Sequence, residues 1–273
     1  MAIQFGICNE IFEGWSLDDT VAFVARAGYD CLEIAPFTLA RHVTDIPATT
    51  RAHARELAAR HNIRISGIHW VLAQTEGLHM TCADDATRQR TSDYFCHLVD
   101  FCADLGGQSI VVGSPRQRSL TEDVSREQGW QRATEVFRAG VAHAAARNVT
   151  LCLEPLSPAD TNFINTHTEA IAFIKQFQSP HFKIILDTKA MCSMGKPIPQ
   201  IIRESRGHFA YFHANDENLK GPGFGAVDFK PIAAALREVG YDGVVSVEVF
   251  KFEEGPEAIA TRSLEYLKRT FAE

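Results

Sequence analysis

The sequence predicts a single (β/α)8 barrel, and three observations lead to that prediction. Eight short apolar runs alternate with longer amphipathic segments, a pattern that favours a parallel sheet with helical connections. The chain has 273 residues, and such barrels typically have roughly 250. No change of composition or Pro/Ser-rich linker divides it, so residues 1–273 are expected to form one domain. An open doubly wound sheet is the alternative, but no GxGxxG motif follows the first apolar run.

The predicted strands are short runs rich in β-branched and aliphatic residues, as expected for strands buried on both faces. In chain order they are Ile3–Cys8, Cys31–Ala35, Arg64–His69, Ser109–Val112, Thr150–Leu153, Lys183–Leu186, Ala210–His213 and Gly243–Val249. Eight such runs over this length indicate a closed barrel rather than an open sheet.

The predicted helices are the amphipathic segments between these runs. They are Asp18–Ala27, Ala48–His61, Ala86–Leu105, Gln131–Arg147, Thr168–Gln178, Ile198–Ser205, Lys230–Val239 and Pro256–Phe271. Gly28, Gly106 and Gly240 stand where a helix ends and the next strand approaches, as C-terminal glycine caps do. The glycine-rich segment 220–225 is expected to be a mobile loop near the site.

Charge and cysteine content exclude several classes of protein. The net charge of -7, with Lys and Arg spread along the chain, disfavours nucleic acid as a partner. No basic leader and no apolar stretch of membrane-spanning length is present, so no membrane partner is expected. The seven cysteines include no CxxC pair and are interpreted as reduced residues. The expected location is therefore the cytoplasm.

Four apolar runs in the second half of the chain each end on a residue type that binds metal ions: Glu154, Asp187, His213 and Glu248. These residues lie roughly 30 positions apart, about one strand–helix unit. The carboxyl ends of barrel strands meet at one rim, and a buried carboxylate there needs a cation or donor. The pattern predicts one shared divalent ion. Carboxylate oxygens with one imidazole suit Mn²⁺, Mg²⁺ or Co²⁺, and Zn²⁺ is a further alternative.

A divalent ion beside a ketose makes the adjacent C–H more acidic. Glu154 and Glu248 are expected on different strands, so they could flank a bound sugar and act as an acid/base pair. Asp187 and His213 would then be mainly ligands.

These motifs resemble the sugar phosphate isomerase/epimerase family, a xylose-isomerase-like TIM barrel family that includes the ketose 3-epimerases. The resemblance covers nearly the whole chain and rests on the segments 153–156, 160–166, 186–188, 212–213 and 247–248. It implies the same four metal ligands, commonly for Mn²⁺. It also implies that Glu154 and Glu248 move a proton at C3 of a sugar through a cis-enediolate. Relatives are often dimers or tetramers, so a homodimer or homotetramer is expected.

The segments that contact substrate in this family differ here. Asp160 stands where the ketose epimerases have Glu, Ala190 where they have His, and Leu219 where they have Arg. The resemblance therefore implies the reaction class more firmly than the substrate.

Further side chains are predicted near the substrate. Lys189 follows a metal ligand and could pair with Asp187 or with an anionic substrate. Glu33, which closes the second strand, could hold a substrate hydroxyl or make a structural hydrogen bond to a loop. His69, which closes the third strand, could bind the sugar, and Trp70 could form a wall of the pocket or pack in the core. Arg118, with Arg116, could hold an anion or simply lie in a solvated loop.

Four other functions stay open at this point. A lyase or dehydratase acting on a keto-inositol or keto-glycoside could use the same enediolate. Hydroxypyruvate isomerase has a similar metal pattern but usually carries a His where this chain has Ala190. An endonuclease acting on abasic DNA needs more ligands and a basic groove. A non-catalytic sugar-binding barrel would not need the complete ligand set.

Overall fold

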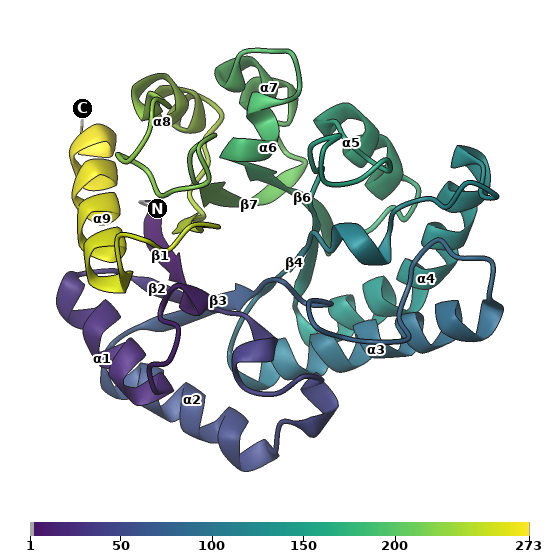
Figure 1. Cartoon of the computed structure of the whole chain (residues 1–273), viewed down its shortest axis with the longest axis horizontal. Helices are drawn as coiled ribbons and strands as arrows, with labels where there is room; N and C mark the ends of the chain where they lie inside the picture. The colour runs from purple at the N-terminus through teal and green to yellow at the C-terminus, as the bar shows by residue number, and fades with distance from the viewer. Residues whose placement is uncertain (1–2, 273) are drawn as a thin grey trace.

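The computed structural model describes residues 3–272 and confirms the closed parallel barrel. Each strand pairs in parallel with the next, and β8 pairs with β1, which closes the cylinder. Figure 1 shows the strands at the centre with the helices arranged around them. The strands are β1 Gln4–Cys8, β2 Cys31–Ile34, β3 Arg64–Ile68, β4 Ser109–Val112, β5 Thr150–Leu153, β6 Phe182–Asp187, β7 Phe209–Ala214 and β8 Val244–Val247.

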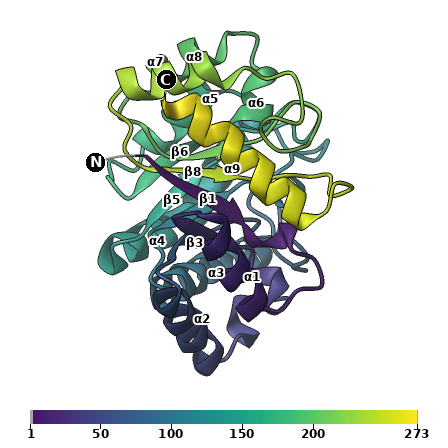
Figure 2. The same cartoon turned by 90° about the vertical axis from the view of Figure 1, so that its left-hand side faces the viewer.

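The helices form the outer layer. They are α1 Leu17–Ala27, α2 Ala48–Arg60, α3 Asp85–Asp104, α4 Arg126–Arg147, α5 His167–Lys175, α6 Thr188–Cys192, α7 Ile198–Glu204, α8 Phe229–Glu238 and α9 Pro256–Ala272. Short 3₁₀ helices lie at Asn9–Ile11, Pro36–Thr38, Val43–Asp45 and Pro115–Gln117. Figure 2 shows α9 on the outside of the strands near β1, where the rings of Phe5 and Phe271 meet edge to face at 5.5 Å.

The core has two parts. The larger cluster packs the outer faces of the strands against the helices. The smaller cluster consists of strand residues and fills the barrel interior: Cys31, Val111, Cys152, Ile185, Tyr211 and Val244. In the interior, the Tyr211 hydroxyl and the Ser66 hydroxyl share a hydrogen bond of 2.7 Å, which satisfies both buried groups. The barrel is therefore a filled scaffold that holds the strand ends rigidly.

Local sequence signals explain most helix boundaries, including one that the amphipathic pattern placed wrongly. Helix α4 begins at Arg126, five residues before the predicted start, because Ser125 and Gln128 form a capping box. The glycine caps at Gly28 and Gly240 are confirmed, with φ of 92° and 75°. The sequence analysis missed α6, whose five residues are too few to show periodicity. Within residues 3–272, no helix combines the length and apolar character needed to cross a bilayer.

Candidate metal centre

The four predicted ligands meet at the carboxyl ends of four consecutive strands. Asp187 ends β6, His213 lies near the end of β7, and Glu154 and Glu248 directly follow β5 and β8. One ligating atom from each residue lies within 4.8 Å of one atom from every other, and all four residues are buried. Three carboxylates and one imidazole at this spacing form a donor set that could hold one divalent cation.

Neighbouring donors hold these carboxylates in place. The backbone N–H of Ala190 donates to Asp187 Oδ1 at 2.7 Å, so Asp187 also caps α6. Asn215 Nδ2 donates to Asp187 Oδ2 at 2.5 Å and to Glu248 Oε2 at 3.3 Å. Trp70 Nε1 donates to Glu248 Oε1 at 2.8 Å. Oxygens fixed in this way need little reorganisation to accept an ion.

The ionisation of the cluster without metal shows how strongly it favours a cation. Burial, followed by the charges of Asp187 and Glu248, raises the pKa of Glu154 to about 8. Burial and the charge of Glu248 raise the pKa of Asp187 to about 6. Burial opposes ionisation of Glu248, but the neighbouring His213 imidazole outweighs it and lowers the pKa of Glu248. Three buried carboxylates this close repel one another, and a divalent ion would relieve the repulsion.

Two further observations fit a metal ion at this place. His213 Nδ1 lies 3.1 Å from Glu248 Oε2 but has no hydrogen-bond partner of acceptable geometry among the described residues. An ion at this place would satisfy this buried nitrogen. In addition, a Cβ at Gly113 would lie 2.3 Å from Glu154 Oε2, so the Glu154 carboxylate occupies space that only a glycine at position 113 leaves free.

A cavity of about 690 Å³ opens onto these carboxylates. Its lining includes Glu154, Asp187, Glu248, Trp70 and Phe250, with Arg41, Arg116, Asp160 and Lys189 among the polar side chains. The carboxylates of the candidate centre thus face a space large enough for a sugar-sized molecule.

Two predicted substrate contacts, Asp160 and Lys189, line this cavity and pair with each other. Lys189 Nζ lies 2.7 Å from Asp160 Oδ2 and 5.1 Å from the centre of the Phe250 ring. Burial opposes ionisation of Asp160, but hydrogen bonds from Lys189 and Ser157 outweigh it and lower the pKa of Asp160. The partner of Lys189 is therefore Asp160, and not Asp187 as one sequence-based alternative had it.

Arg118 is not among the residues that line the cavity. It is 1% exposed, and it donates to the carbonyl oxygens of Glu154 at 2.6 Å and Ile164 at 3.3 Å. It therefore supports the backbone at a metal ligand, which differs from the substrate contact predicted from the sequence. Its neighbour Arg116 is exposed and does line the cavity.

Glu33 and His69 also lie outside the cavity lining, and both side chains are fully buried. Glu33 Oε2 accepts from His213 Nε2 at 3.1 Å, and His69 pairs with Glu10. Burial opposes ionisation of Glu33, but His213 and His69 outweigh it and lower the pKa of Glu33 to about 2. The structural role weighed for Glu33 matches its position, whereas the buried position of His69 differs from the sugar contact predicted from the sequence.

The sequence analysis missed Asn215 and the donor role of Trp70. Asn215 lies two residues after His213, and this spacing could have placed it on the same face of the strand. Trp70 was predicted as a wall of the pocket, but its backbone φ of 51° could not be read from the sequence. That left-handed conformation accompanies the hydrogen bond from its indole to Glu248.

A family model described as the xylose isomerase-like TIM barrel matches residues 21–270. The chain belongs to this family. A D-psicose 3-epimerase from Ruminiclostridium cellulolyticum is 26% identical over 233 residues, which cover 83% of this chain and 76% of that protein. An L-ribulose 3-epimerase from Mesorhizobium japonicum is 27% identical over 241 residues, covering 87% and 76%.

Solved structures of family members share the architecture. A structure of an L-ribulose 3-epimerase superposes with a TM-score of 0.86 at 22% identity, covering 100% of this chain and 95% of that one. This similarity shows the fold of the xylose isomerase-like family over the whole described chain. The family resemblance and the barrel fold expected from the sequence are thereby confirmed.

Proposed function

We propose that the protein is a divalent-metal-dependent epimerase that inverts a carbon atom next to the carbonyl of a keto-sugar. The observation that carries this proposal is the buried cluster of Glu154, Asp187, His213 and Glu248, whose three carboxylates line a sugar-sized cavity. The family relatives named as ketose 3-epimerases align with most of this chain, which supports the same reaction class. We propose C3 as the carbon that is inverted.

The residues divide into two roles. A bound divalent ion would polarise the ketose carbonyl and make the neighbouring C–H more acidic. Glu154 and Glu248 come from strands that are not neighbours, so their carboxylates can approach the sugar from two sides. One would remove the proton from the carbon, and the other would return a proton to the opposite face. Asp187 and His213 would hold the ion, and Trp70 and Phe250 would shield the reacting carbon from water.

We propose Mn²⁺ as the metal, since a set of three carboxylates and one imidazole suits a hard ion of this kind. The cysteines from Cys8 to Cys192 are all free thiols, which supports a reducing compartment such as the cytoplasm. Lys189 at the cavity wall is paired with Asp160, which supports a neutral sugar rather than a phosphorylated one beside this side chain. A homodimer or homotetramer remains part of the proposal.

The test is proton exchange in deuterated buffer. A panel of free ketoses is incubated with Mn²⁺-loaded and chelated protein, and deuterium uptake and products are followed by NMR. We expect exchange at C3 and formation of the C3 epimer only with metal. Exchange that is equal with and without metal contradicts metal dependence, and an unsaturated product shows elimination instead of epimerisation.

Two variants test the acid/base pair. Glu154→Gln and Glu248→Gln are each expected to lower turnover by roughly 100-fold or more, the usual contribution of a general acid or base. The matched control is Glu76→Gln, because Glu76 lines the same cavity but pairs with Arg41 at the exposed rim. Full turnover by a Glu248→Gln protein that still binds metal would show that Glu248 is not an acid/base residue.

A further inference from the structure

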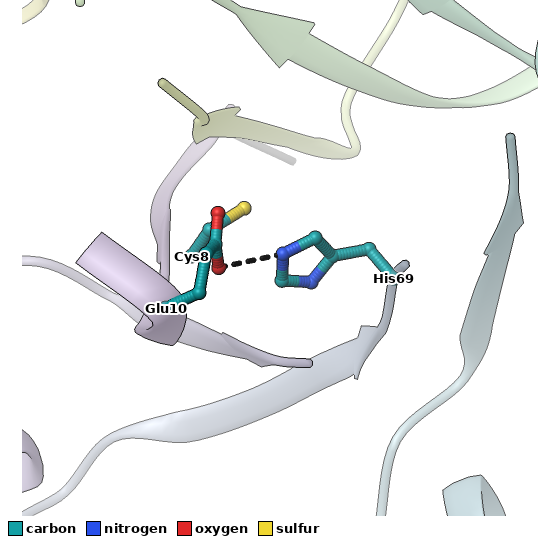
Figure 3. A group of neighbouring side chains, drawn as sticks. All are labelled: Cys8, Glu10 and His69. Atoms are coloured by element: carbon teal, nitrogen blue, oxygen red, sulfur yellow. Dashed lines mark hydrogen bonds and ion pairs between the residues drawn. The ribbon is translucent and has the colours of Figure 1, made fainter. Parts of the chain in front are cut away.

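A chain of alternating carboxylates and imidazoles lies behind the candidate metal centre. Glu33 Oε2 lies 3.1 Å from His213 Nε2, and Glu33 Oε1 lies 3.7 Å from His69 Nδ1. The opposite edge of the His69 ring lies 2.7 Å from Glu10 Oε2, as the dashed line in Figure 3 shows. Glu33, His69 and His213 are 0% exposed and Glu10 is 8% exposed, so water does not screen these contacts.

This series of carboxylates and imidazoles determines which nitrogen of His213 is available to a metal ion. His213 Nε2 lies 3.1 Å and 3.3 Å from the two oxygens of Glu33, so this nitrogen carries a proton and donates it. The other nitrogen, Nδ1, points to the side of Glu248 and has no hydrogen-bond partner among the described residues. An imidazole binds a metal ion in its neutral form, in which one nitrogen donates and the other accepts, so a proton held on Nε2 then leaves the lone pair on Nδ1.

We propose that Glu33 is a positioning residue for the metal centre. It holds His213 as the Nε2–H tautomer with Nδ1 directed at the metal ion, and the His69–Glu10 pair holds Glu33 in turn. This inference rests on the proposed function to the extent that it needs a metal ion at the cluster. Glu33 does not line the cavity, and its carboxylate lies on the Nε2 side of His213, whereas the Nδ1 side faces Glu248. It acts through His213, as second-shell carboxylates do in other metal sites.

The same residues could instead hold a second metal ion, since two groups also lie close together: Cys8 with Glu10 and His69 (Figure 3), and Cys8 with Glu33 and His213. The geometry favours hydrogen bonding. Two ligand atoms that each lie about 2.1 Å from one tetrahedral ion are roughly 3.4 Å apart. His69 Nε2 and Glu10 Oε2 are only 2.7 Å apart, which is a hydrogen-bond distance. Cys8 Sγ donates to Glu33 Oε2 at 3.5 Å, so the thiol is a donor to the chain rather than a free thiolate.

His69 and Glu10 support the Glu33 carboxylate from the side opposite His213. A lone carboxylate buried behind His213 would be costly and free to rotate. Both oxygens of Glu33 lie within 3.3 Å of His213 Nε2, and Oε1 also lies 3.7 Å from His69 Nδ1, an ion-pair distance, so Glu33 has an imidazole on each side. His69 ends up next to Glu33 because it follows β3 directly, and Glu10 comes from the 3₁₀ helix after β1.

The first test is the affinity for Mn²⁺, measured by calorimetry or by electron paramagnetic resonance without any substrate. Glu33→Gln keeps the size of the side chain but removes its charge. We expect Mn²⁺ to bind roughly 10- to 100-fold more weakly, the usual loss on removing such a partner. The KM for the sugar at saturating metal should stay unchanged, because Glu33 does not line the cavity.

The matched control is Ser66→Ala. It removes a buried hydrogen bond to Tyr211 in the same barrel interior but takes no part in the chain. We expect wild-type Mn²⁺ affinity from this variant. Wild-type affinity in a folded Glu33→Gln protein would overturn the proposal. If Glu33→Gln does not fold, the His69→Gln variant is measured instead. Weaker Mn²⁺ binding by this variant supports the proposal, and unchanged binding overturns it.

The second test reads the tautomer directly. Long-range ¹⁵N–¹H correlation spectra of the protein loaded with diamagnetic Mg²⁺ or Zn²⁺ should show His213 protonated at Nε2 and metal-bound at Nδ1. A spectrum with the proton on Nδ1 would overturn the proposal. The two proposals fail separately: a wild-type protein that binds metal but epimerises no ketose contradicts only the proposed function. An active enzyme in which Glu33→Gln binds Mn²⁺ normally contradicts only the role of Glu33.

Discussion

The side-chain amide of Asn215 joins Asp187 to Glu248. Its Nδ2 atom donates to Asp187 Oδ2 at 2.5 Å and to Glu248 Oε2 at 3.3 Å, across the rim of the barrel. Its Oδ1 atom accepts from the backbone N–H of Lys189 at 2.7 Å, which fixes the orientation of the amide. Asn215 thus sets the spacing of two expected metal ligands and ties them to the first turn of α6.

Replacing Asn215 with Leu is therefore expected to weaken Mn²⁺ binding by roughly 10-fold or more, because two ligands lose a shared donor. Calorimetric titration with Mn²⁺ measures this change. The control is Asn162→Ala, whose amide bonds only to the backbone of Leu120. Unchanged affinity in Asn215→Leu would show that the ligands hold their positions without the amide.

The raised pKa values of Glu154 and Asp187 predict a pH-dependent stability of the metal-free protein. Both carboxyl groups hold their protons more tightly in the folded state than in the unfolded state. The unfolding free energy therefore falls as the pH rises above the ordinary carboxyl pKa, until the folded pKa of about 8 for Glu154 is passed. His213 acts in the same direction, because its pKa is raised in the folded protein.

Thermal melts of chelated protein should therefore show a lower Tm at alkaline pH than at pH 6. Added Mn²⁺ should raise the Tm most at the alkaline end, where all three carboxylates are ionised and the ion meets no competing protons. A Tm of the chelated protein that is constant or rises over this range would contradict the assigned shifts.

Gly113→Ala is expected to disturb the centre without disturbing the barrel. The new Cβ would lie 2.3 Å from Glu154 Oε2, so the carboxylate must rotate away from the cluster. We expect a loss of turnover of roughly 100-fold, since a displacement near 1 Å at a reacting group has this effect. Turnover assays with circular dichroism check it, and Pro115→Ala in the same loop serves as the control. Wild-type turnover would show that Glu154 can shift at no cost.

The Lys189–Asp160 pair is expected to act as one unit on the substrate. Lys189→Met and Asp160→Asn should each raise the KM for the ketose by roughly 3- to 10-fold, and the double variant should be no worse than either. Kinetic measurements on the three variants give the coupling. The exposed Arg41–Glu76 pair at the rim is the control and should change KM little. Strictly additive losses would mean that the two side chains contact the sugar independently.

The convergence of Glu154, Asp187, His213 and Glu248 could be predicted because parallel strands in a closed barrel leave no other place for their carboxyl ends. Each residue ends or directly follows an apolar run that is visible in the sequence. The same reasoning predicted Trp70 at the cavity wall. These predictions needed only the order of elements, and helix boundaries such as the start of α4 had no influence on them.

Glu33, His69 and Arg118 show the limit of that reasoning. Their positions along the chain placed them near the rim, but the direction and burial of a side chain depend on its three-dimensional neighbours. Arg118 instead donates to the Glu154 carbonyl, and Glu33 pairs with His213 from a strand far along the chain. The sequence contains no signal for either contact, because both partners come from segments that only the closed barrel brings together.

The sequence by itself determined the barrel, its strand order and the convergence of Glu154, Asp187, His213 and Glu248, because hydrophobic periodicity and strand ends are local properties of the chain. The tertiary structure alone decided which side chains line the cavity and which support the ligands from behind. Asp160 and Lys189 face the cavity, whereas Glu33 and His69 lie buried beside His213. The physical reason is that a buried charge takes the partner which the packed fold places within hydrogen-bonding distance, and that distance is set by closure of the barrel.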